Sequence, residues 1–446
     1  MDSYYKNVKD FGAVGDGIAN DTAAIQRALD AGGAVYVPGG TYRTGTLYLR
    51  SNGGLELAPD AMLVGSPDPA DYNAWDFCPQ NWKSIAEKAG GAHLIVALEV
   101  ENVFLGGHGR IWGNREAFFD TAVTPSRNDF TGWRPSQMLF FCESKNISVS
   151  DLTLLNSPYW CLFLYGCDNA RIKGLNISNT PRTSWNGDGI DIDCCRNVTV
   201  SDCIVRAADD CVTIRAAGAN RLVHHDNVCE YIAISNCVML DGHCGVRYGV
   251  GTGLIRNCSA SNLVMKDTLF GIGVHQSYET KIFPTAAAGC QVEGLTFDNM
   301  SIDSRMPLYI TATTPPNVIQ HESQHQIHGL SYNNIRARGY WSVEMIANED
   351  MNIYDVQMSN CSFQMHDGDE EVYALPKEKR TSWGQYFEYG MYMENIRDFQ
   401  FHNVRLTWEN ERPEWKSALC MKNTHELTFR DCRFDAPRNG LDVTRL

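Results

Sequence analysis

A short phrase that recurs along the chain constrains its fold more than any other feature. Each copy begins with alternating apolar residues and turns at Asn or Asp, which a cysteine follows in five copies: residues 200–204, 234–238, 255–259, 358–362 and 429–433. Three further copies carry another residue in place of the cysteine: residues 149–153, 297–301 and 401–405. Apolar alternation with a period of two, closed by Asn or Asp, is typical of a short strand followed by a turn. The sequence therefore predicts many short strands.

An asparagine often precedes these strands, and its spacing indicates the length of the repeat. The markers are Asn102, Asn146, Asn169, Asn197, Asn352 and Asn395, and the third lies 23 residues after the second and 28 before the fourth. Repeats of this length without helical periodicity are typical of a solenoid, in which each coil stacks on the previous one. A cysteine that recurs at one position would then pack inside the coils as a small apolar side chain.

The first fifty residues have a different pattern. Residues 21–30 have helical apolar spacing, begin at a candidate N-cap, Asp21, and end before two glycines, and residues 34–37 are typical of a strand. The open end of a solenoid exposes unpaired strand edges, and a helix can cover them. We therefore expect residues 1–50 to form an N-terminal cap.

Two long segments, 306–328 and 366–391, interrupt the repeat. Loops of this length in a compact protein are usually functional or disordered. The second segment carries five aromatic residues, Tyr373, Trp383, Tyr386, Phe387 and Tyr389. These residues would either form a wall that stacks on a sugar ring or pack over the coils.

Charge and cysteine usage exclude several classes of partner. The chain has 38 Lys and Arg against 53 Asp and Glu, a formal net charge of −15, which argues against a nucleic-acid partner. The apolar run 94–98 is too short to span a membrane, and the first residues contain no apolar signal region. We therefore expect a cytoplasmic protein, unless a leader has been removed. The sixteen cysteines lack metal-binding spacing, so we expect no metal centre.

The densest group of polar residues lies within residues 185–248 and includes Asp188, Asp209 and Asp210. Asp209 follows Asp188 by 21 residues, close to one coil, and neighbouring coils lie about 4.8 Å apart. Two carboxylates at such range suit acid/base cleavage of a glycosidic bond, and crowding should raise the pKa of one of them. A Ca²⁺ site is the rival interpretation. Asp209 and Asp210 can face the same side only across a bend, and otherwise one of them is a turn acceptor.

These residues resemble the catalytic motifs of glycoside hydrolase family 28, the polygalacturonases and their relatives. Residues 186–191, Asn-Gly-Asp-Gly-Ile-Asp, are similar to the family's Asn-Thr-Asp-Gly-x-Asp; residues 209–211 match its Asp-Asp-Cys; and residues 242–244 are similar to its Gly-His-Gly. Residues 10–17 and 38–42 resemble the capping segment of the wider pectate-lyase-like superfamily. The resemblance implies an all-β fold, a right-handed parallel β-helix forming a single domain over residues 1–446.

The resemblance also implies roles for individual residues. Asp209 would be the general acid, and Asp188 and Asp210 would hold and deprotonate the attacking water in a single displacement with inversion. His243 would orient or tune the acid, and Asn186 would contact substrate. No cofactor is implied. Asp191 and Asp193 are expected to be mainly structural.

One departure from the family affects the expected substrate. Polygalacturonases carry an Arg-Ile-Lys motif whose cations bind the substrate carboxylate, whereas the corresponding positions here are Gly273 and His275. Glycine cannot replace a bidentate clamp, and histidine is only partly charged near neutral pH. Arg215, Arg247 and Lys281 could substitute from neighbouring coils, although we expect each of them to be a solvated surface charge.

The sequence thus predicts an inverting glycosidase acting on a pectic or related plant polysaccharide or oligosaccharide other than plain polygalacturonate. A lyase or a carbohydrate epimerase on the same fold is one alternative. The other is a β-helix that binds glycans without catalysis. We expect a carbohydrate to be the partner, with neither nucleic acid nor membrane involved.

Overall fold

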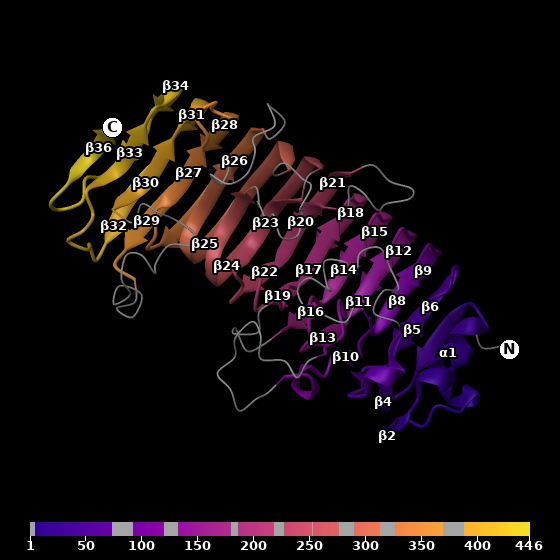
Figure 1. Cartoon of the computed structure of the whole chain (residues 1–446). Helices are drawn as coiled ribbons and strands as arrows, with labels where there is room; N and C mark the ends of the chain where they lie inside the picture. The colour runs from indigo at the N-terminus through magenta and orange to yellow at the C-terminus, as the bar shows by residue number, and fades with distance from the viewer. Residues whose placement is uncertain are drawn as a thin grey trace. The chain divides into compact units, whose positions relative to one another are not determined.

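Parallel strands dominate the computed structural model of the chain (Figure 1). The structure describes residues 5–73, 92–119, 133–179, 186–217, 227–251, 253–275, 290–312, 326–368 and 388–446. The chain divides into two compact units, Met1–Val238 and Met239–Leu446, which we describe separately. None of the helices in these ranges has the length and apolar character needed to span a membrane.

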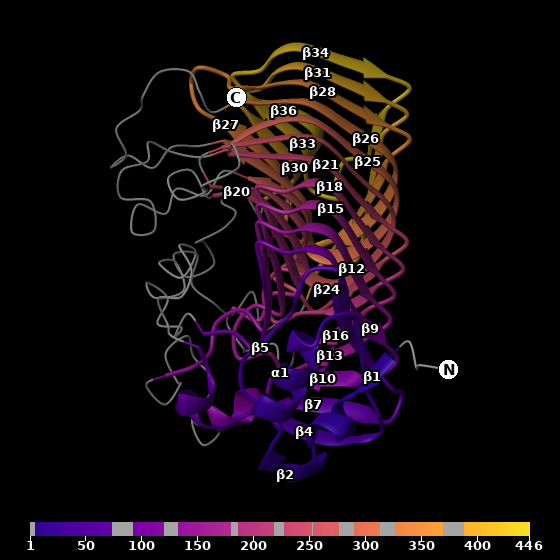
Figure 2. The same ribbon diagram turned by 90° about the vertical axis from the view of Figure 1, so that its right-hand side faces the viewer.

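In the first unit, three series of parallel strands follow one another around each coil. The first series is β5 (Leu47–Tyr48), β8 (Ile95–Leu98), β11 (Leu139–Cys142), β14 (Leu162–Tyr165), β17 (Ile190–Asp193) and β20 (Val212–Ala216). The second is β1 (Tyr5–Asn7), β3 (Ala34–Val37), β6 (Gly53–Leu57), β9 (Glu101–Gly107), β12 (Lys145–Ser150), β15 (Asp168–Lys173), β18 (Arg196–Ser201) and β21 (Val228–Ser235). The third is β2 (Asp16–Asn20), β4 (Gly40–Thr44), β7 (Ala61–Gly65), β10 (Arg110–Trp112), β13 (Thr153–Leu155), β16 (Asn176–Ser178) and β19 (Ile204–Arg206). Figure 2 shows β9, β12, β15, β18 and β21 stacked in this order.

The second unit repeats the arrangement. Its first series is β23 (Cys244–Gly251), the ends of the long strands β24 (Leu254–His275) and β25 (Gln291–Ala312), β27 (Val343–Ala347), β30 (Tyr389–Glu394), β33 (Ser417–Lys422) and β36 (Leu441–Arg445). The other strands are β26 (Ile327–Gly339), β28 (Ile353–Ser359), β29 (Ser362–His366), β31 (Arg397–His402), β32 (Arg405–Glu409), β34 (His425–Arg430) and β35 (Arg433–Phe434). Strand β22 (Val238–Leu240) includes the residues on either side of the division between the units.

Asparagine and aspartate occupy the corners of the coils, as the recurring phrase predicts. Asp202 and Asn236 have φ of 59° and 56°, in the left-handed region that these two residue types tolerate best. The marker asparagines form a ladder, because Asn146 donates to Asn102 at 3.0 Å and Asn102 donates to Asn52 at 2.7 Å. Of the six markers, Asn352 is the exception, because it lacks a positive φ.

The cysteines pack inside the coils, with one exception to the predicted ladder. All of the described cysteines are free, and all but Cys432 are buried. Ser201 of β18 pairs with Ser235 of β21, and Cys203 and Cys237 each lie two residues after these serines. The two cysteines therefore occupy equivalent positions. Cys258 does not share the position of Cys361: it pairs in register with Leu295 early in a coil, whereas Cys361 precedes β29 at a later corner. The prediction that the copy at 255–259 is equivalent to the other copies is therefore wrong.

The predicted cap is present at the N-terminus of the first unit. Helix α1 (Thr22–Asp30) buries Ala24, Ile25, Ala28 and Leu29 and packs against β3, β5 and β6. Asp21 stands at the N-cap position but does not cap the helix, because its carboxylate accepts hydrogen bonds from the amides of Val14 and Gly15. Three short 3-10 helices accompany it: η1 (Val8–Phe11), η2 (Pro69–Asp71) and η3 (Arg115–Ala117).

The described ends of the two predicted insertions belong to strands. Residues 306–312 complete β25, residues 327–328 begin β26, residue 366 ends β29, and residues 389–391 begin β30. Tyr389 is buried in β30, and the other four aromatic residues of the second insertion lie outside the described residues.

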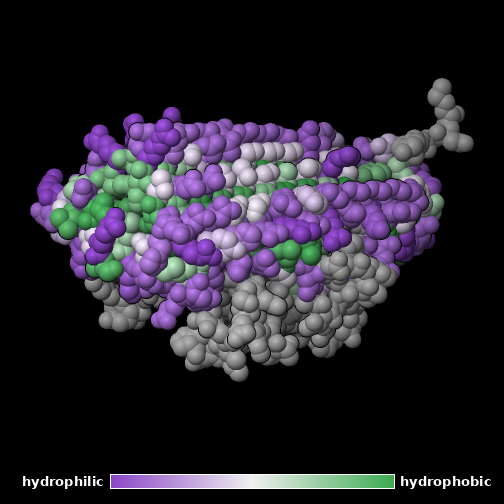
Figure 3. All heavy atoms as spheres, turned by 90° about the horizontal axis from the view of Figure 1, so that it is seen from above, coloured by the Kyte–Doolittle hydropathy of each residue, from purple (hydrophilic) through white to green (hydrophobic). Residues whose placement is uncertain are grey.

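Polar and apolar residues alternate along the second series of strands. In β15, Asn169, Arg171 and Lys173 are exposed while Ala170 and Ile172 are buried. Hydrophilic residues cover much of the face shown in Figure 3. The strands that lead from the candidate site lack this alternation: every residue of β11, β14, β17 and β20 is buried.

Candidate active site

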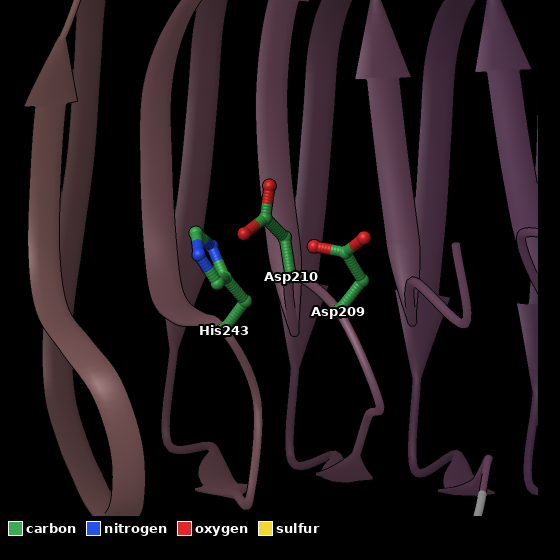
Figure 4. A group of neighbouring side chains, drawn as sticks. All are labelled: Asp209, Asp210 and His243. Atoms are coloured by element: carbon green, nitrogen blue, oxygen red, sulfur yellow. The ribbon is translucent and has the colours of Figure 1, made fainter. Parts of the chain in front are cut away.

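Three aspartates meet at the start of two paired strands in the first unit. Asp188 lies two residues before β17, and Asp209 and Asp210 lie just before β20, which pairs with β17 in parallel. The Gly189 amide donates to the Asp210 carbonyl at 2.9 Å, so the two segments are joined directly. Carboxylate oxygens of Asp209 and Asp210 lie within 4.8 Å of each other, and Figure 4 shows both side chains on the segment leading into β20.

A bend allows the side chains of Asp209 and Asp210 to face the same side, which adjacent residues of a regular strand cannot do. Residues 208–209 form a bend outside any strand, so the alternation of a strand does not apply. The Asp209 carboxylate accepts a hydrogen bond from the Asn186 amide at 3.2 Å, and the Asp210 carboxylate accepts one from the Thr213 hydroxyl at 3.2 Å. Asp188 and Asp210 are buried, whereas Asp209 is half-buried.

The backbone of Asp188 is held from two sides. Its carbonyl accepts hydrogen bonds from the Cys161 amide and from the side-chain amide of Asn179, both at 3.0 Å. Asn179 is itself fixed, because its side-chain oxygen accepts from the Ser157 amide at 3.0 Å. The carboxylate of Asp188 therefore projects from a backbone with little freedom to move.

Burial and neighbouring charge favour a protonated carboxyl in this group. Burial is the largest cause that raises the pKa of Asp188 well above its usual range, and the carboxylates of Asp191, Asp209 and Asp210 add to it. The guanidinium of Arg215 opposes the rise without cancelling it. Because the carboxyls lie close together, a proton that this environment favours belongs to the group as a whole rather than to one residue.

Arg215 lies in a buried ion-pair network, so the expectation of a solvated surface charge was wrong for this residue. Its side chain is 3% exposed, and it lies 3.3 Å from the Asp191 carboxylate and 3.5 Å from that of Asp193. Burial alone would lower the pKa of Arg215, but the carboxylates of Asp191 and Asp193 raise it instead. Asp191 and Asp193 are thus buried and paired, in line with the structural part expected of them.

The remaining predicted residues that the structure describes lie in the second unit. His243 directly precedes β23, and its ring lies edge-on to Phe270 with centroids 5.2 Å apart. Arg247 is half-buried on β23. His275, at the end of β24, is 1% exposed and packs beside Tyr309 with ring centroids 5.6 Å apart. Lys281 lies outside the described residues.

The environment of Gly273 explains why this position carries no arginine. A Cβ atom on Gly273 would lie 3.0 Å from the Cys244 sulfur and 3.3 Å from the His275 ring, which leaves no room for a long side chain without rearrangement. Arg247 pairs in register with Gly273 on the adjacent strand. The nearest cation in this row therefore comes from the preceding coil.

Sequence reasoning missed three buried residues beside the aspartates: Arg134, Tyr159 and Trp160. The Arg134 guanidinium donates to the side-chain oxygen of Asn186 at 3.2 Å, and the Arg215 guanidinium carbon lies 4.4 Å from the Trp160 ring centroid. None of the three belongs to a motif, and Arg134 lies 52 residues before its partner. No local pattern could have connected them.

The site offers only part of a metal-binding shell within the first unit. Asp209 and Asp210 would supply two oxygen ligands, whereas Ca²⁺ takes about six to eight. Asp191 is not available as a ligand, because its carboxylate is paired with Arg215. The arrangement fits acid/base chemistry better than it fits a Ca²⁺ cage.

Known proteins resemble this chain in sequence and in fold. Residues 5–77 match the family described as rhamnogalacturonase A/epimerase, pectate lyase-like, and residues 77–244 match glycosyl hydrolases family 28. Along 95% of the chain, the structure resembles the family 28 exopolygalacturonase of Yersinia enterocolitica, with a TM-score of 0.72, 19% identity and 78% of that chain covered. The stacked coils and this likeness define a right-handed parallel β-helix of the pectate-lyase-like type.

Curated relatives narrow this class further. A probable polygalacturonase of Vitis vinifera is 31% identical over 46% of this chain and 43% of its own length. A polygalacturonase of Chamaecyparis obtusa is 25% identical over 81% of this chain and 67% of its own length. The chain thus spans less than half of the first relative. It is polygalacturonase-like, and residues 77–244 match the glycosyl hydrolases of family 28.

Proposed function

We propose that the chain is a glycosidase that hydrolyses a pectic or related plant polysaccharide or oligosaccharide with inversion at the anomeric carbon. The observation that carries the proposal is the meeting of Asp188, Asp209 and Asp210 at one end of β17 and β20, with the pKa of Asp188 raised. The match of residues 77–244 to glycosyl hydrolases family 28 supports the same conclusion.

In the proposed reaction, Asp209 donates its proton to the glycosidic oxygen as the bond to the anomeric carbon breaks. Water attacks that carbon from the opposite face, and Asp188 or Asp210 accepts the proton that the water loses. Asp209 suits the acid role because it is the half-exposed member of the group, whereas Asp188 and Asp210 are buried. One proton passes from Asp209 to the leaving group, and one passes from the water to Asp188 or Asp210. The number of protons on the three carboxyl groups is therefore unchanged.

His243 is proposed to orient the acid, and Asn186 to contact the sugar. Asn186 is half-buried, so part of it is open to a substrate. Its backbone amide donates a hydrogen bond to Asp209, which places it beside the proposed acid. His243 is half-buried at the start of β23, and Phe270 limits the rotation of its ring.

We infer that plain polygalacturonate is not the preferred substrate. The position of the family's substrate-binding arginine is Gly273, and neighbouring side chains fill the space around it. Arg247, on the adjacent strand, remains as a cation that could contact the sugar, whereas His275 is buried. With a net charge of −15, the chain also gains little from attraction to a polyanion. A rhamnose-containing or neutral oligosaccharide fits these features better.

A panel of defined pectic oligosaccharides tests this proposal, with the anomeric configuration of the product followed by NMR from the first seconds. We expect inverted product from a substrate other than polygalacturonate, and loss of more than about a hundredfold in kcat for Asp209→Asn. Retained configuration, or an Asp209→Asn variant as active as the wild type, would contradict the mechanism. Ultraviolet absorbance from an unsaturated uronide would instead identify a lyase. Binding without cleavage of any member would identify a glycan-binding protein.

A further inference from the structure

Two arginines and two aromatic rings form a continuous stack behind the three aspartates. The Arg134 guanidinium carbon lies 4.8 Å from the Tyr159 ring centroid, Tyr159 stacks on Trp160 at 4.9 Å with 19° between the ring planes, and the Arg215 guanidinium carbon lies 4.4 Å from the Trp160 centroid. All four side chains are at most 3% exposed. The stack therefore lies within the protein, where cation–π contacts are strongest.

Each end of the stack binds one end of the segment that carries Asp188. At one end, Arg134 donates to the side-chain oxygen of Asn186 at 3.2 Å. At the other end, Arg215 donates to Asp191 at 3.3 Å. Asp188 lies between these two anchors, two residues after the first and three before the second.

The first anchor also reaches Asp209. Asn186 has φ of 61°, a left-handed conformation that asparagine tolerates, and in this conformation its amide donates to the Asp209 carboxylate at 3.2 Å. The same residue thus accepts from Arg134 through its side chain and donates to Asp209 through its backbone. A change at Arg134 would be transmitted to Asp209 through one intervening residue.

We propose that the stack Arg134–Tyr159–Trp160–Arg215 is a positioning device that sets the relative placement of Asp188 and Asp209. The inference rests on the proposed hydrolase function. In this proposal Arg134 acts on the aspartates through Asn186 and is therefore a positioning residue. The planar guanidinium suits the role because it stacks on one ring while its N–H groups remain directed at fixed acceptors: Arg134 also donates to the Pro158 carbonyl at 3.2 Å. Lysine would keep the charge but lose the planar stacking and the fixed fork.

The test compares Arg134→Lys and Arg134→Gln with the wild type, on whichever panel oligosaccharide the wild type cleaves. Misplacement of a reacting group by about 1 Å costs about a hundredfold in rate. We expect kcat to fall about 10- to 100-fold in both variants, with KM changed less than about threefold and a pH–rate profile displaced from that of the wild type.

Arg115→Gln is the matched control. Arg115 is also a buried arginine of the first unit and lies over Phe119 at 3.8 Å, the ring that Arg134 approaches at 5.8 Å, but it does not belong to the stack Arg134–Tyr159–Trp160–Arg215. We expect this variant to lose stability while the folded fraction keeps the kcat and pH profile of the wild type.

The outcomes separate the two levels of the proposal. If both Arg134 variants keep the kcat and pH profile of the wild type per folded molecule, as Arg115→Gln should, Arg134 is merely structural and the inference is wrong. If Arg134→Gln does not fold, Arg134→Lys alone decides. If the wild type cleaves nothing in the panel, the proposed function itself fails, and the inference fails with it.

Discussion

At the scale of single residues, the buried carboxyl groups of the site lie in two kinds of environment. Asp191 and Asp193 share the guanidinium of Arg215, which is buried with them. Asp188 has carboxyl neighbours instead, and burial with these neighbours raises its pKa. One arginine thus pairs with both structural carboxylates, whereas Asp188 lies among other carboxyl groups that favour its protonated form.

Replacing Arg215 by methionine should destabilise the protein by about 3–5 kcal/mol, because removing one partner of a buried ion pair leaves the other charged and unpaired. Urea unfolding monitored by circular dichroism measures this loss. Arg50→Met is the control: Arg50 pairs with Asp30 at 2.8 Å on the surface, and its loss should cost less than about 1 kcal/mol. Equal effects of the two substitutions would contradict the assignment.

Replacing Asp188 by asparagine should abolish activity but stabilise the fold at neutral pH. A carboxyl group whose pKa is raised in the folded state contributes stability below its unfolded pKa, and this contribution is lost as pH rises through the folded pKa. Asparagine cannot ionise and avoids that loss. We expect Asp188→Asn to exceed the wild type in free energy of unfolding by at least about 1 kcal/mol near pH 7, with the difference vanishing near pH 3. A variant less stable than the wild type at both pH values would refute this interpretation.

At the scale of elements, the sequence predicts the coils well because their corners are local. A turn with positive φ needs Asn, Asp or Gly at one position, and this requirement is visible at Asp202 and Asn236 without knowledge of the rest of the chain. The alignment of one copy with another is not local. The phrase at 255–259 has the same pattern as the others, yet Cys258 lies at a different corner. Only the pairing of strands in register distinguishes one corner from another.

The same distinction applies to the site. Asp188, Asp209 and Asp210 could be predicted because they lie in short motifs whose spacing matches one coil. The burial of Arg215 could not, since a single arginine within a strand has no pattern that separates a surface charge from a buried partner. Arg134, Tyr159 and Trp160 come from other coils, and stacking alone brings them to residues 186–191.

The N-terminal cap provides a prediction at this scale. Ile25 is fully buried where α1 covers the first coils, so Ile25→Ala should cost about 2–5 kcal/mol through lost burial and the cavity left behind. Ile18, which is 77% exposed, offers the control: Ile18→Ala should change stability by less than about 0.5 kcal/mol. Thermal unfolding of both variants measures the difference. A small effect at Ile25 would mean that the helix does not protect the end of the core.

At the scale of the molecule, the series of strands in the first unit differ in their exposure to solvent. Strands β15 and β18 alternate exposed and buried residues, as strands with one solvated face do. Strands β11, β14, β17 and β20 have no exposed position, so both faces of this sheet are covered. Phe140, Phe163 and Tyr165, which precede the aspartates along the sheet, are at most 1% exposed. Among the described residues of the first unit, this series of strands therefore presents no exposed side chain to a polysaccharide.

Cleavage should consequently begin at a chain end. A substrate that can extend from the aspartates in only one direction must present its terminus, so we expect short products of uniform length from the earliest times. An oligosaccharide labelled at one end, separated by chromatography during the reaction, reveals the pattern, and an endo-acting pectinase serves as the control. The viscosity of a polymeric substrate should fall slowly relative to the release of reducing ends. Rapid loss of viscosity with products of mixed length would show that the chain crosses the aspartates in both directions, and that the buried aromatic face does not limit the substrate.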